Sequence, residues 1–295
     1  MTTAPRPSPA APRRRRVRSV AAPRRAAAAA VVHLLLAGLA LAFALPALWL
    51  LLAAFDARAS ARVRLPEAFT LDNFAAVATR DVLFLPIWNS LFICGGAAVV
   101  TVAASVLAAY PLSRFGLRFG RPFLYTVLFA TGLPLTAIMV PVYSLFVQFG
   151  LVDSRWATML FLAAASLPFG IWLTKNFLDG IPVELEEAAW VDGASARQSL
   201  LRLVVPLAAP GLAVVGVFTL VVTWGNFFVP FLLLRSAERI PAAVRIYTFF
   251  GQYGQVSYGE LAAYSLLYAL PVVVLYLVAA RSLGGAFNFG GAMKG

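Results

Sequence analysis

Six long apolar segments dominate this sequence and constrain its fold more than any other feature. They run over Val31–Ala54, Phe84–Ala109, Pro122–Gln148, Trp156–Asn176, Leu207–Leu234 and Leu261–Ala280. About 20 apolar residues in a helix cross the hydrocarbon core of a bilayer, and each segment reaches that length. Hydrophobic residues make up 61% of the chain and charged residues only 12%, against about 25% charged in an average soluble domain. We therefore expect an all-α polytopic membrane protein, built as a bundle of six transmembrane helices.

The interiors of these segments carry proline but no charge. Prolines lie at depth at positions Pro46, Pro134, Pro141, Pro168, Pro230 and Pro271. Such kinks persist in a membrane where neighbouring helices satisfy the freed carbonyls, so they predict a packed bundle with a cavity. No Asp, Glu, Lys or Arg stands in the middle of a segment, whereas proton relays and ion-coupled pumps use such residues. The pattern argues against a proton-driven transporter, although sodium held by backbone carbonyls would leave no such trace.

Positive charges predict the orientation. The first 30 residues hold eight arginines and five prolines, which predicts a disordered cytoplasmic tail over residues 1–30 and a transmembrane domain over residues 31–295. We expect this tail to rest on anionic lipid and not on nucleic acid, because a span follows at once. With the N-terminus inside, sixteen Lys and Arg lie on the inner side and eight on the outer side; without the tail the count is eight against eight. The bias predicts a multi-pass membrane protein with both termini inside.

The sequence carries no signature of an enzyme or a nucleotide site. The only lysines are Lys175 and Lys294, and there is no Gly-x-x-x-x-Gly-Lys-Ser/Thr phosphate loop and no His-Glu-x-x-His pair. A single cysteine, Cys94, and a single histidine, His33, exclude a disulfide framework and a Cys/His metal site. We expect no catalytic residue, no metal and no cofactor on this chain, so the energy for uphill transport would come from elsewhere.

Polar and aromatic residues within the spans are candidates for a solute path. We single out Asn89, Tyr143, Trp224, Asn226 and Phe227, because amides bond hydroxyl groups and aromatic rings stack on sugar faces. The alternative is that small polar residues join helices and that Trp and Tyr mark the membrane interface. The run from Trp224 to Phe228 is the strongest candidate, since on one helix it would place an indole, an amide and two phenyl rings within two turns.

The segment 178–206, between the fourth and fifth spans, predicts two short helices. Pro182 suits the first turn of a helix, and the three glutamates that follow it complement a helix N-terminus. Gly193 suits the left-handed position after a helix, and Ser195 with Gln198 is a capping-box pattern. A compact element of this kind can fit a groove on a partner protein. The alternative is an amphipathic connector.

The same segment resembles a known motif. Glu187-Ala188-Ala189, Gly193 and Leu203-Val204-Val205-Pro206 are similar to the EAA motif of bacterial ABC importer permeases, which usually ends Ile-x-Leu-Pro. The string from Ile181 to Ser195 resembles the carbohydrate-uptake, MalG-like members. Further similarity lies in Phe69–Phe74, Asn89–Leu91, Ala109–Phe115, Leu167–Trp172 and the ending Gly290–Gly295. Trp224-Gly225-Asn226 departs from the Trp-Asn-Glu-Phe often found there, because the acid is absent.

The resemblance implies a MetI-like permease fold, with a coupling helix on segment 178–206 that docks into a cleft of a cytoplasmic ABC ATPase dimer. The positions it assigns to docking are Glu187, Ala188, Ala189, Asp192, Gly193 and Pro206. It implies that ATP and magnesium are bound by the ATPase, and that a second, MalF-like permease completes the pathway. An extracellular or periplasmic sugar-binding protein would deliver the solute, and membrane lipid would surround the spans.

These features predict the permease subunit of an ATP-driven importer for a mono- or oligosaccharide. A permease of the same class for glycerol phosphate or a polyol is the nearest alternative. A stand-alone facilitator would not need the acidic loop, and a membrane-embedded enzyme would need reactive side chains at depth.

Overall fold

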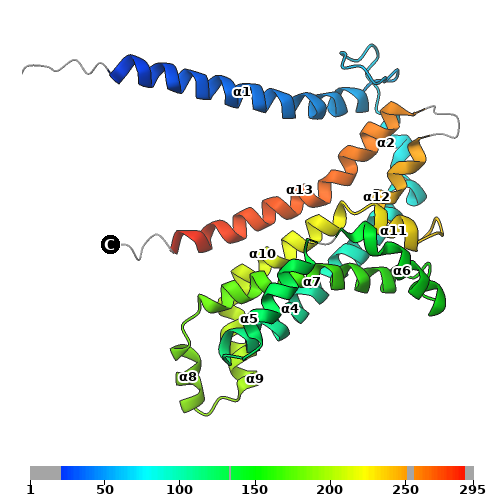
Figure 1. Ribbon diagram of the computed structural model, residues 1–295. Coiled ribbons are helices and arrows are strands. Elements are labelled where there is room, and N and C mark those ends of the chain that lie inside the picture. Colours follow the sequence, from blue (N-terminus) through cyan, green and yellow to red (C-terminus); the bar gives the residue numbers. More distant parts are fainter. Residues whose placement is uncertain (1–20, 133, 251–255, 290–295) are drawn as a thin grey trace, which may run out of the picture. The chain divides into compact units, whose positions relative to one another are not determined.

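The computed structural model describes residues 21–132, 134–250 and 256–289, and these residues form helices and loops, with two isolated β-bridges and no longer strand (Figure 1). Two compact units can be distinguished, Met1–Leu48 and Trp49–Gly295. The expected tail as far as residue 20 and the ending Gly290–Gly295 lie outside the described residues.

Helix α1 spans Ala21–Ala54 and crosses the boundary between the units. The sequence predicts a disordered tail up to residue 30, whereas helix α1 begins at Ala21. Alanine has the highest intrinsic helix propensity, and five alanines stand in a row from Ala26 to Ala30. Pro23 lies in the first turn of α1, where a missing N–H costs no helical hydrogen bond.

The second unit contains the remaining elements. They are α2 (Asp72–Val77), the π-helical η1 (Arg80–Phe84), α3 (Leu85–Ser90), the π-helical η2 (Leu91–Gly95), α4 (Gly96–Arg114), α5 (Gly120–Ala130), α6 (Leu135–Gln148), α7 (Arg155–Asp179), α8 (Glu184–Val191), α9 (Ala196–Ser199), the π-helical η3 (Leu200–Val204), α10 (Val205–Trp224), α11 (Phe228–Leu233), α12 (Ala242–Arg245), the 3-10 helix η4 (Ile246–Phe249) and α13 (Tyr258–Phe289).

Five helical stretches are long and apolar enough to cross a membrane. They are Ala29–Ala54, Arg80–Arg114, Arg155–Asp179, Ala196–Trp224 and Tyr258–Ala279. The pair α5 and α6 makes a sixth span if it counts as one broken helix. The prediction of an all-α, membrane-spanning bundle is therefore confirmed.

Two of the predicted spans are not continuous helices. The span expected over Pro122–Gln148 is divided into α5 and α6, whose axes differ by 93°. Pro134 has an extended backbone at the start of α6, and proline lacks the N–H that a continuous helix would use. The span expected over Leu207–Leu234 ends at Trp224, where Gly225 caps α10, and the chain resumes as the separate helix α11.

The centre of the second unit is the close packing of α4 against α7. A Cβ atom added at Gly170 of α7 would lie 2.5 Å from the Ser105 hydroxyl oxygen and 2.9 Å from the Thr101 methyl group, both on α4. The Thr101 hydroxyl also donates to the Ala163 carbonyl across this contact at 3.2 Å. Small residues at such crossings let two membrane helices approach closely. Helix α10 packs onto the same pair, with Gly211 against the ring of Phe177.

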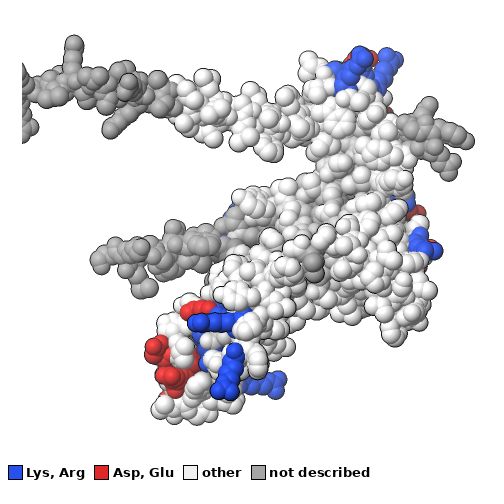
Figure 2. Space-filling model, viewed as in Figure 1, with Lys and Arg blue, Asp and Glu red and all other residues white. Residues whose placement is uncertain are grey.

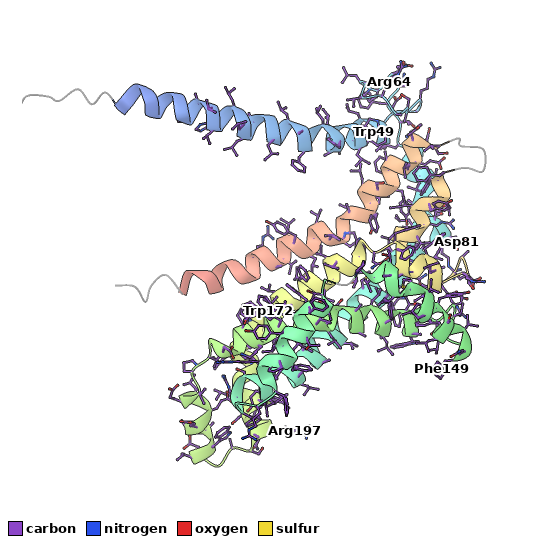
Figure 3. The ribbon with its side chains drawn as sticks, viewed as in Figure 1. Trp49, Arg64, Asp81, Phe149, Trp172 and Arg197 are labelled. Atoms are coloured by element: carbon purple, nitrogen blue, oxygen red, sulfur yellow. The ribbon has the colours of Figure 1, made fainter. Side chains whose placement is uncertain are left out.

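The two ends of the second unit carry different elements. Helices α8 and α9 lie at one end, here called the loop end, and α2 and α12 lie at the opposite, far end (Figure 1). Arg197 and Phe149 mark these two ends in the side-chain view (Figure 3).

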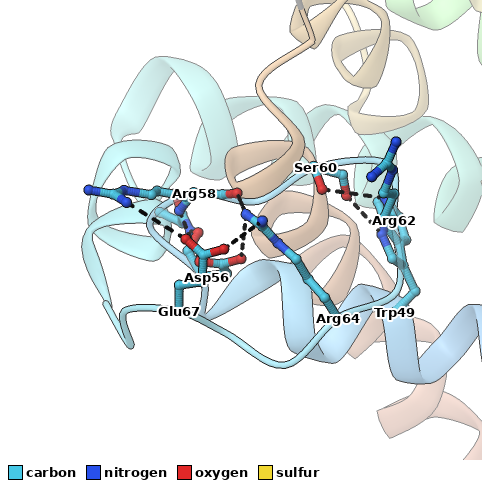
Figure 4. Close-up of polar contacts among 8 residues, drawn as sticks. Trp49, Asp56, Arg58, Ser60, Arg62, Arg64 and Glu67 are labelled. Atoms are coloured by element: carbon cyan, nitrogen blue, oxygen red, sulfur yellow. Dashed lines mark hydrogen bonds and ion pairs between the residues drawn. The ribbon is translucent and has the colours of Figure 1, made fainter.

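At the far end, the loop after α1 is held by charged and polar contacts (Figure 4). Asp56, whose side chain is 3% exposed, pairs with Arg64 at 3.5 Å, and Arg64 pairs with Glu67 at 2.9 Å. The Trp49 indole donates to the Ser60 carbonyl at 3.1 Å. The loop is therefore tied both to itself and to the end of α1.

We expect Gly170→Val to destabilise the protein by roughly 1–3 kcal/mol, because overpacking at the α4–α7 crossing forces the helices apart. The matched control is Gly95→Val, since an added Cβ at Gly95 meets no atom within 4 Å. Thermal unfolding of the purified protein in detergent measures the difference. Equal melting temperatures for the two variants would contradict the close contact at Gly170.

Candidate functional site

Helix α8 and the turn after it have the geometry that the sequence predicts. Three glutamates occupy the first turn of α8, and Asp192 caps its C-terminus. Gly193 follows with a φ of +86°, a conformation that glycine adopts without steric cost. The amide of Gly193 donates to the Trp190 carbonyl at 3.0 Å, so the helix ends in a closed turn.

Helix α9 is fixed by the predicted capping box. The Ser195 hydroxyl accepts from the Gln198 amide at 3.3 Å, and the Gln198 side-chain oxygen accepts from the Ser195 amide at 2.8 Å. The chain then continues through η3 into α10, with Pro206 in the first turn of α10. The predicted pair of short helices is confirmed, and its end leads without interruption into a span.

One face of α8 is not covered by any other part of the described chain. Glu184, Glu187, Ala188 and Val191 follow the i, i+3, i+4, i+7 spacing of a single helix face, and all four are exposed. Val191 is 89% exposed. Acidic side chains gather on this end of the molecule (Figure 2). The face combines apolar surface with negative charge, as a surface that docks onto a partner protein would.

The docking residues predicted from the motif are spread over this loop. Glu187 and Ala188 lie on the exposed face, Ala189 is half-buried beside it, and Asp192 and Gly193 form the exposed turn. Pro206 is exposed as well, but it lies in the first turn of α10 and not on the docking face. The structure therefore brings five of the six residues together.

Glu186 has a different environment from the other glutamates of α8, and the sequence analysis missed it. Its side chain is 0% exposed and forms an ion pair with the Nε atom of Arg114, whose side chain is 3% exposed. The Tyr110 hydroxyl donates to the second carboxylate oxygen at 2.8 Å. Glu186 is two positions from Glu184, so a helix turns it away from the exposed face. That spacing is the signal in the sequence that could have identified it.

A second polar link joins the same elements. The Ser113 hydroxyl at the end of α4 donates to Asp179 at the end of α7, with an oxygen–oxygen distance of 2.6 Å. Lys175 pairs with the other oxygen of Asp179 at 2.5 Å. The ends of α4 and α7 are thus connected directly beneath α8.

A cavity of about 610 Å³ lies between the bent pair α5–α6, α7 and α10. Its lining is Ala130, Thr131, Leu135, Ile138, Phe161, Leu162, Ala164, Ala165, Ser166, Pro168, Phe169, Phe218, Thr219, Val222, Thr223 and Asn226. The volume is in the range of small-molecule sites, which are largely apolar with a few polar groups. The rings of Phe169 and Phe218 are in contact, with their centroids 4.3 Å apart and their planes tilted by 34°.

Of the five predicted pathway residues, Asn226 lines this cavity. Its side-chain oxygen accepts from the Val229 amide in the first turn of α11 at 3.0 Å, so its NH₂ group remains as a donor. Trp224 is 3% exposed and stacks on Tyr268, with a centroid distance of 5.6 Å. Phe227 stacks on Phe231 at 4.9 Å. The expectation that Trp224 to Phe228 share one helix is wrong, because α10 ends at Trp224.

The other two predicted pathway residues lie toward the far end. Asn89 is fully buried, donates to the carbonyls of Glu238 and Ile240 at 2.9 and 3.0 Å, and accepts from Arg155 at 2.8 Å. Its amide therefore joins three segments of the chain. Tyr143 accepts a hydrogen bond from Arg235, whose guanidinium lies 5.7 Å from the ring centroid.

Asp153 joins two far-end loops. It has a φ of +62°, and its carboxylate accepts from the amides of Arg235 and Ser236 at 3.0 and 3.1 Å and pairs with Arg239 at 3.3 Å. Partial burial by itself would raise the pKa of Asp153, but the hydrogen bonds from Ser236 and Arg235 and the charge of Arg239 outweigh it, so the pKa is lowered below its usual range.

Comparisons with known proteins agree with this architecture. Residues 101–284, more than half of the chain, match the family described as binding-protein-dependent transport system inner membrane component. The chain is 32% identical over 234 residues to the inner membrane ABC transporter permease protein YcjP of Escherichia coli (strain K12), covering 77% of this chain and 81% of the relative. It is 28% identical to the trehalose transport system permease protein SugB of Mycobacterium tuberculosis (strain CDC 1551 / Oshkosh), and this match covers 92% of this chain and 99% of the relative.

A third relative is the diacetylchitobiose uptake system permease protein NgcG of Streptomyces coelicolor (strain ATCC BAA-471 / A3(2) / M145), at 27% identity over 89% of this chain and 88% of the relative. Among solved structures, a bacterial ABC transporter involved in the import of the acidic polysaccharide alginate matches with a TM-score of 0.74 and 24% identity, covering 86% of this chain and 95% of that one. This likeness shows the same fold.

We expect Asp153→Asn to destabilise the protein by about 2 kcal/mol at pH 7, because it removes a charged acceptor of several hydrogen bonds. Since the folded-state pKa is lowered, this stabilisation is fully present above the ordinary Asp pKa of about 3.9 and is lost as the pH falls through the folded-state value.

Thermal unfolding at pH 7 and at acidic pH measures this effect, with exposed Asp81→Asn as the matched control. The gap in melting temperature between the parent protein and Asp153→Asn should close as the pH is lowered. A gap that stays constant with pH would contradict the role of the Asp153 charge.

Proposed function

Because this chain belongs to the family of binding-protein-dependent transport system inner membrane components, we propose that it is the permease subunit of an ATP-driven ABC importer that carries a mono- or oligosaccharide across the bacterial cytoplasmic membrane. The observation that carries this proposal is the exposed, acidic and apolar face of α8 at the end of a membrane-spanning bundle.

The loop is built to dock. Its two helices are short, α9 has a capping box, and α8 ends in the closed turn at Gly193, so little conformational entropy remains to be lost on binding. In the proposed complex, Glu187, Ala188 and Ala189 enter a cleft of a cytoplasmic ABC ATPase dimer, and Asp192 and Gly193 contact its rim. Pro206 lies in the first turn of α10, so movement of the loop is transmitted directly to a membrane span.

In the proposed transporter, solute passage and ATP hydrolysis belong to different chains. This chain supplies the gate, and the ATPase dimer binds ATP and magnesium and hydrolyses the nucleotide. The permease therefore acts as a transport subunit and not as an enzyme, with no cofactor of its own. The loop end then faces the cytoplasm together with both termini, and a sugar-binding protein delivers solute to the far end.

The cavity supports a neutral, hydroxylated solute. Its described lining contains hydroxyl and amide groups beside the contacting rings of Phe169 and Phe218, and none of these residues is charged. A phosphate ester is usually bound by Arg or Lys, so the lining favours a sugar over glycerol phosphate; a polyol would fit the same chemistry. Sugars are named for relatives such as SugB and NgcG. A second, MalF-like permease would close the open side of the cavity.

We expect Gly193→Asp and Glu187→Lys to lower both ATPase co-purification and sugar uptake at least tenfold, because each changes the charge or fit of the docking face. An added Cβ at Gly193 meets no atom within 4 Å, but the φ of +86° strains most side chains. Gly193→Asn is the matched control, since asparagine tolerates this backbone conformation. If Gly193→Asn and Gly193→Asp lose co-purification and uptake to the same extent, the cause is the fit of the side chain to the ATPase and not its charge. Normal co-purification and normal uptake in Gly193→Asp would refute docking through this turn.

We expect Asn226→Asp to lower sugar uptake roughly 2–10-fold, as the loss of one net hydrogen bond would predict. The aspartate keeps an oxygen to cap α11 but removes the NH₂ donor that faces the cavity. Exposed Asn176→Asp, near the end of α7, is the matched control. Uptake by vesicles that contain the full transporter measures the effect, and unchanged uptake in Asn226→Asp would exclude this contact with solute.

A further inference from the structure

We propose that Glu186, Arg114 and Tyr110 form the joint through which the coupling helix α8 moves the transmembrane bundle. These three are positioning residues, and their role rests on the proposed function above. The name "anchor cluster" is used below for these three side chains.

The side chains of the anchor cluster are buried. The side chains of Glu186 and Arg114 are 0% and 3% exposed, and Tyr110 is 6% exposed. A buried charge without its partner is strongly unfavourable, so the two ionised groups stay together while the protein moves. The contact therefore holds α8 and α4 together more firmly than a surface ion pair could.

The bonds fix both the position and the orientation of α8. Arg114 reaches one oxygen of Glu186 through Nε, and its Nη2 atom donates to the Ile181 carbonyl just before α8 at 3.2 Å. Tyr110, one helical turn earlier in α4, holds the second oxygen of the carboxylate. A carboxylate gripped at both oxygens cannot rotate freely, and charge-assisted bonds of this kind are directional.

Among the described residues, no side chain of α8 belongs to the neighbouring apolar core. That core includes Tyr110 together with Val106, Ala109, Ile171, Leu178, Val204 and Ala208, drawn from α4, α7, η3 and α10. The cluster thus connects α8 to α4 directly, and α4 packs closely on α7 at Gly170. In this proposal, a displacement of α8 is transmitted through α4 to α7, which lines the cavity.

The ion pair between Arg114 and Glu186 bears on the role of the anchor cluster, because a contact that only stabilises the fold would not need two buried charges. Apolar residues of similar volume often stabilise a buried site as well as or better than an ion pair. The charged pair fixes the relative geometry of α4 and α8, which transmission of movement requires and apolar packing alone does not. This difference supplies the test.

The test compares four forms of the complete transporter in proteoliposomes: the parent, Arg114→Leu combined with Glu186→Leu, the exposed control Arg118→Gln, and Glu187→Gln. The double variant removes both buried charges, so neither is left unpaired. Each form carries spin labels at Arg197 on α9 and Leu117 after α4, in a Cys94→Ala background. The readouts are the width of the distance distribution, ATPase co-purification and sugar uptake per ATP hydrolysed.

We expect the parent and Arg118→Gln to show a narrow distance distribution and the same uptake per ATP. The double variant should keep its ATPase but show a broadened distribution and at least a tenfold lower uptake per ATP. Glu187→Gln should weaken ATPase binding without broadening the distribution. If the double variant has the same width of the distance distribution and the same uptake per ATP as the parent, the proposed role of the anchor cluster is wrong.

The two hypotheses fail in different ways. If the parent transporter shows no ATP-dependent sugar uptake, the proposed function fails. The distance measurement still tests the anchor cluster in that case. Equal widths in the parent and the double variant contradict its positioning role, and a broadened distribution in the double variant supports it.

Discussion

The packing of α4 against α7 is the contact on which the rest of the described structure depends. At Gly170 the two helices lie so close that an added Cβ would collide with Ser105 and Thr101. Toward the loop end, α4 ends in Arg114, which pairs with Glu186 of α8, and α7 ends in Asp179, which accepts a hydrogen bond from Ser113 of α4. Toward the middle, α7 forms one wall of the cavity. One helix pair therefore serves both the docking loop and the proposed solute path.

The breaks in the helices gather around that cavity. The α5–α6 break lies between Ala130 and Leu135, and the α10–α11 break follows Trp224, close to Asn226. Irregular backbone at membrane depth is tolerated where it is buried in protein or lines a cavity. Asn226 shows how the freed groups are satisfied, because its side chain caps α11 while it faces the cavity. The rigid α4–α7 pair and the broken helices thus have separate places in the fold.

The sequence predicts the features that depend on local chemistry. Apolar length gives the spans, and the capping box of Ser195 and Gln198 and the positive φ of Gly193 follow from side-chain preferences. Helix breaks at Pro134 and Gly225 are harder to predict, because proline and glycine also occur inside membrane helices, as Pro168 and Gly170 do here. The partners of Glu186 and Asn89 lie 72 and 151 positions away along the chain. The helical spacing on α8 sets Glu186 apart from the exposed glutamates, but only the tertiary structure identifies the partners of both residues.

The most direct measurement is site-specific cross-linking from Ala188 in membranes that contain the whole transporter. A photoreactive residue at this position should form an adduct with the ATPase subunit, and ATP should change the yield. The residue should be protected from reagents added on the outer side. A position 188 that reacts with external reagents, or sugar accumulation at the parental rate after the ATPase has been stripped away, would contradict the proposal that this chain is a gate driven from the cytoplasm.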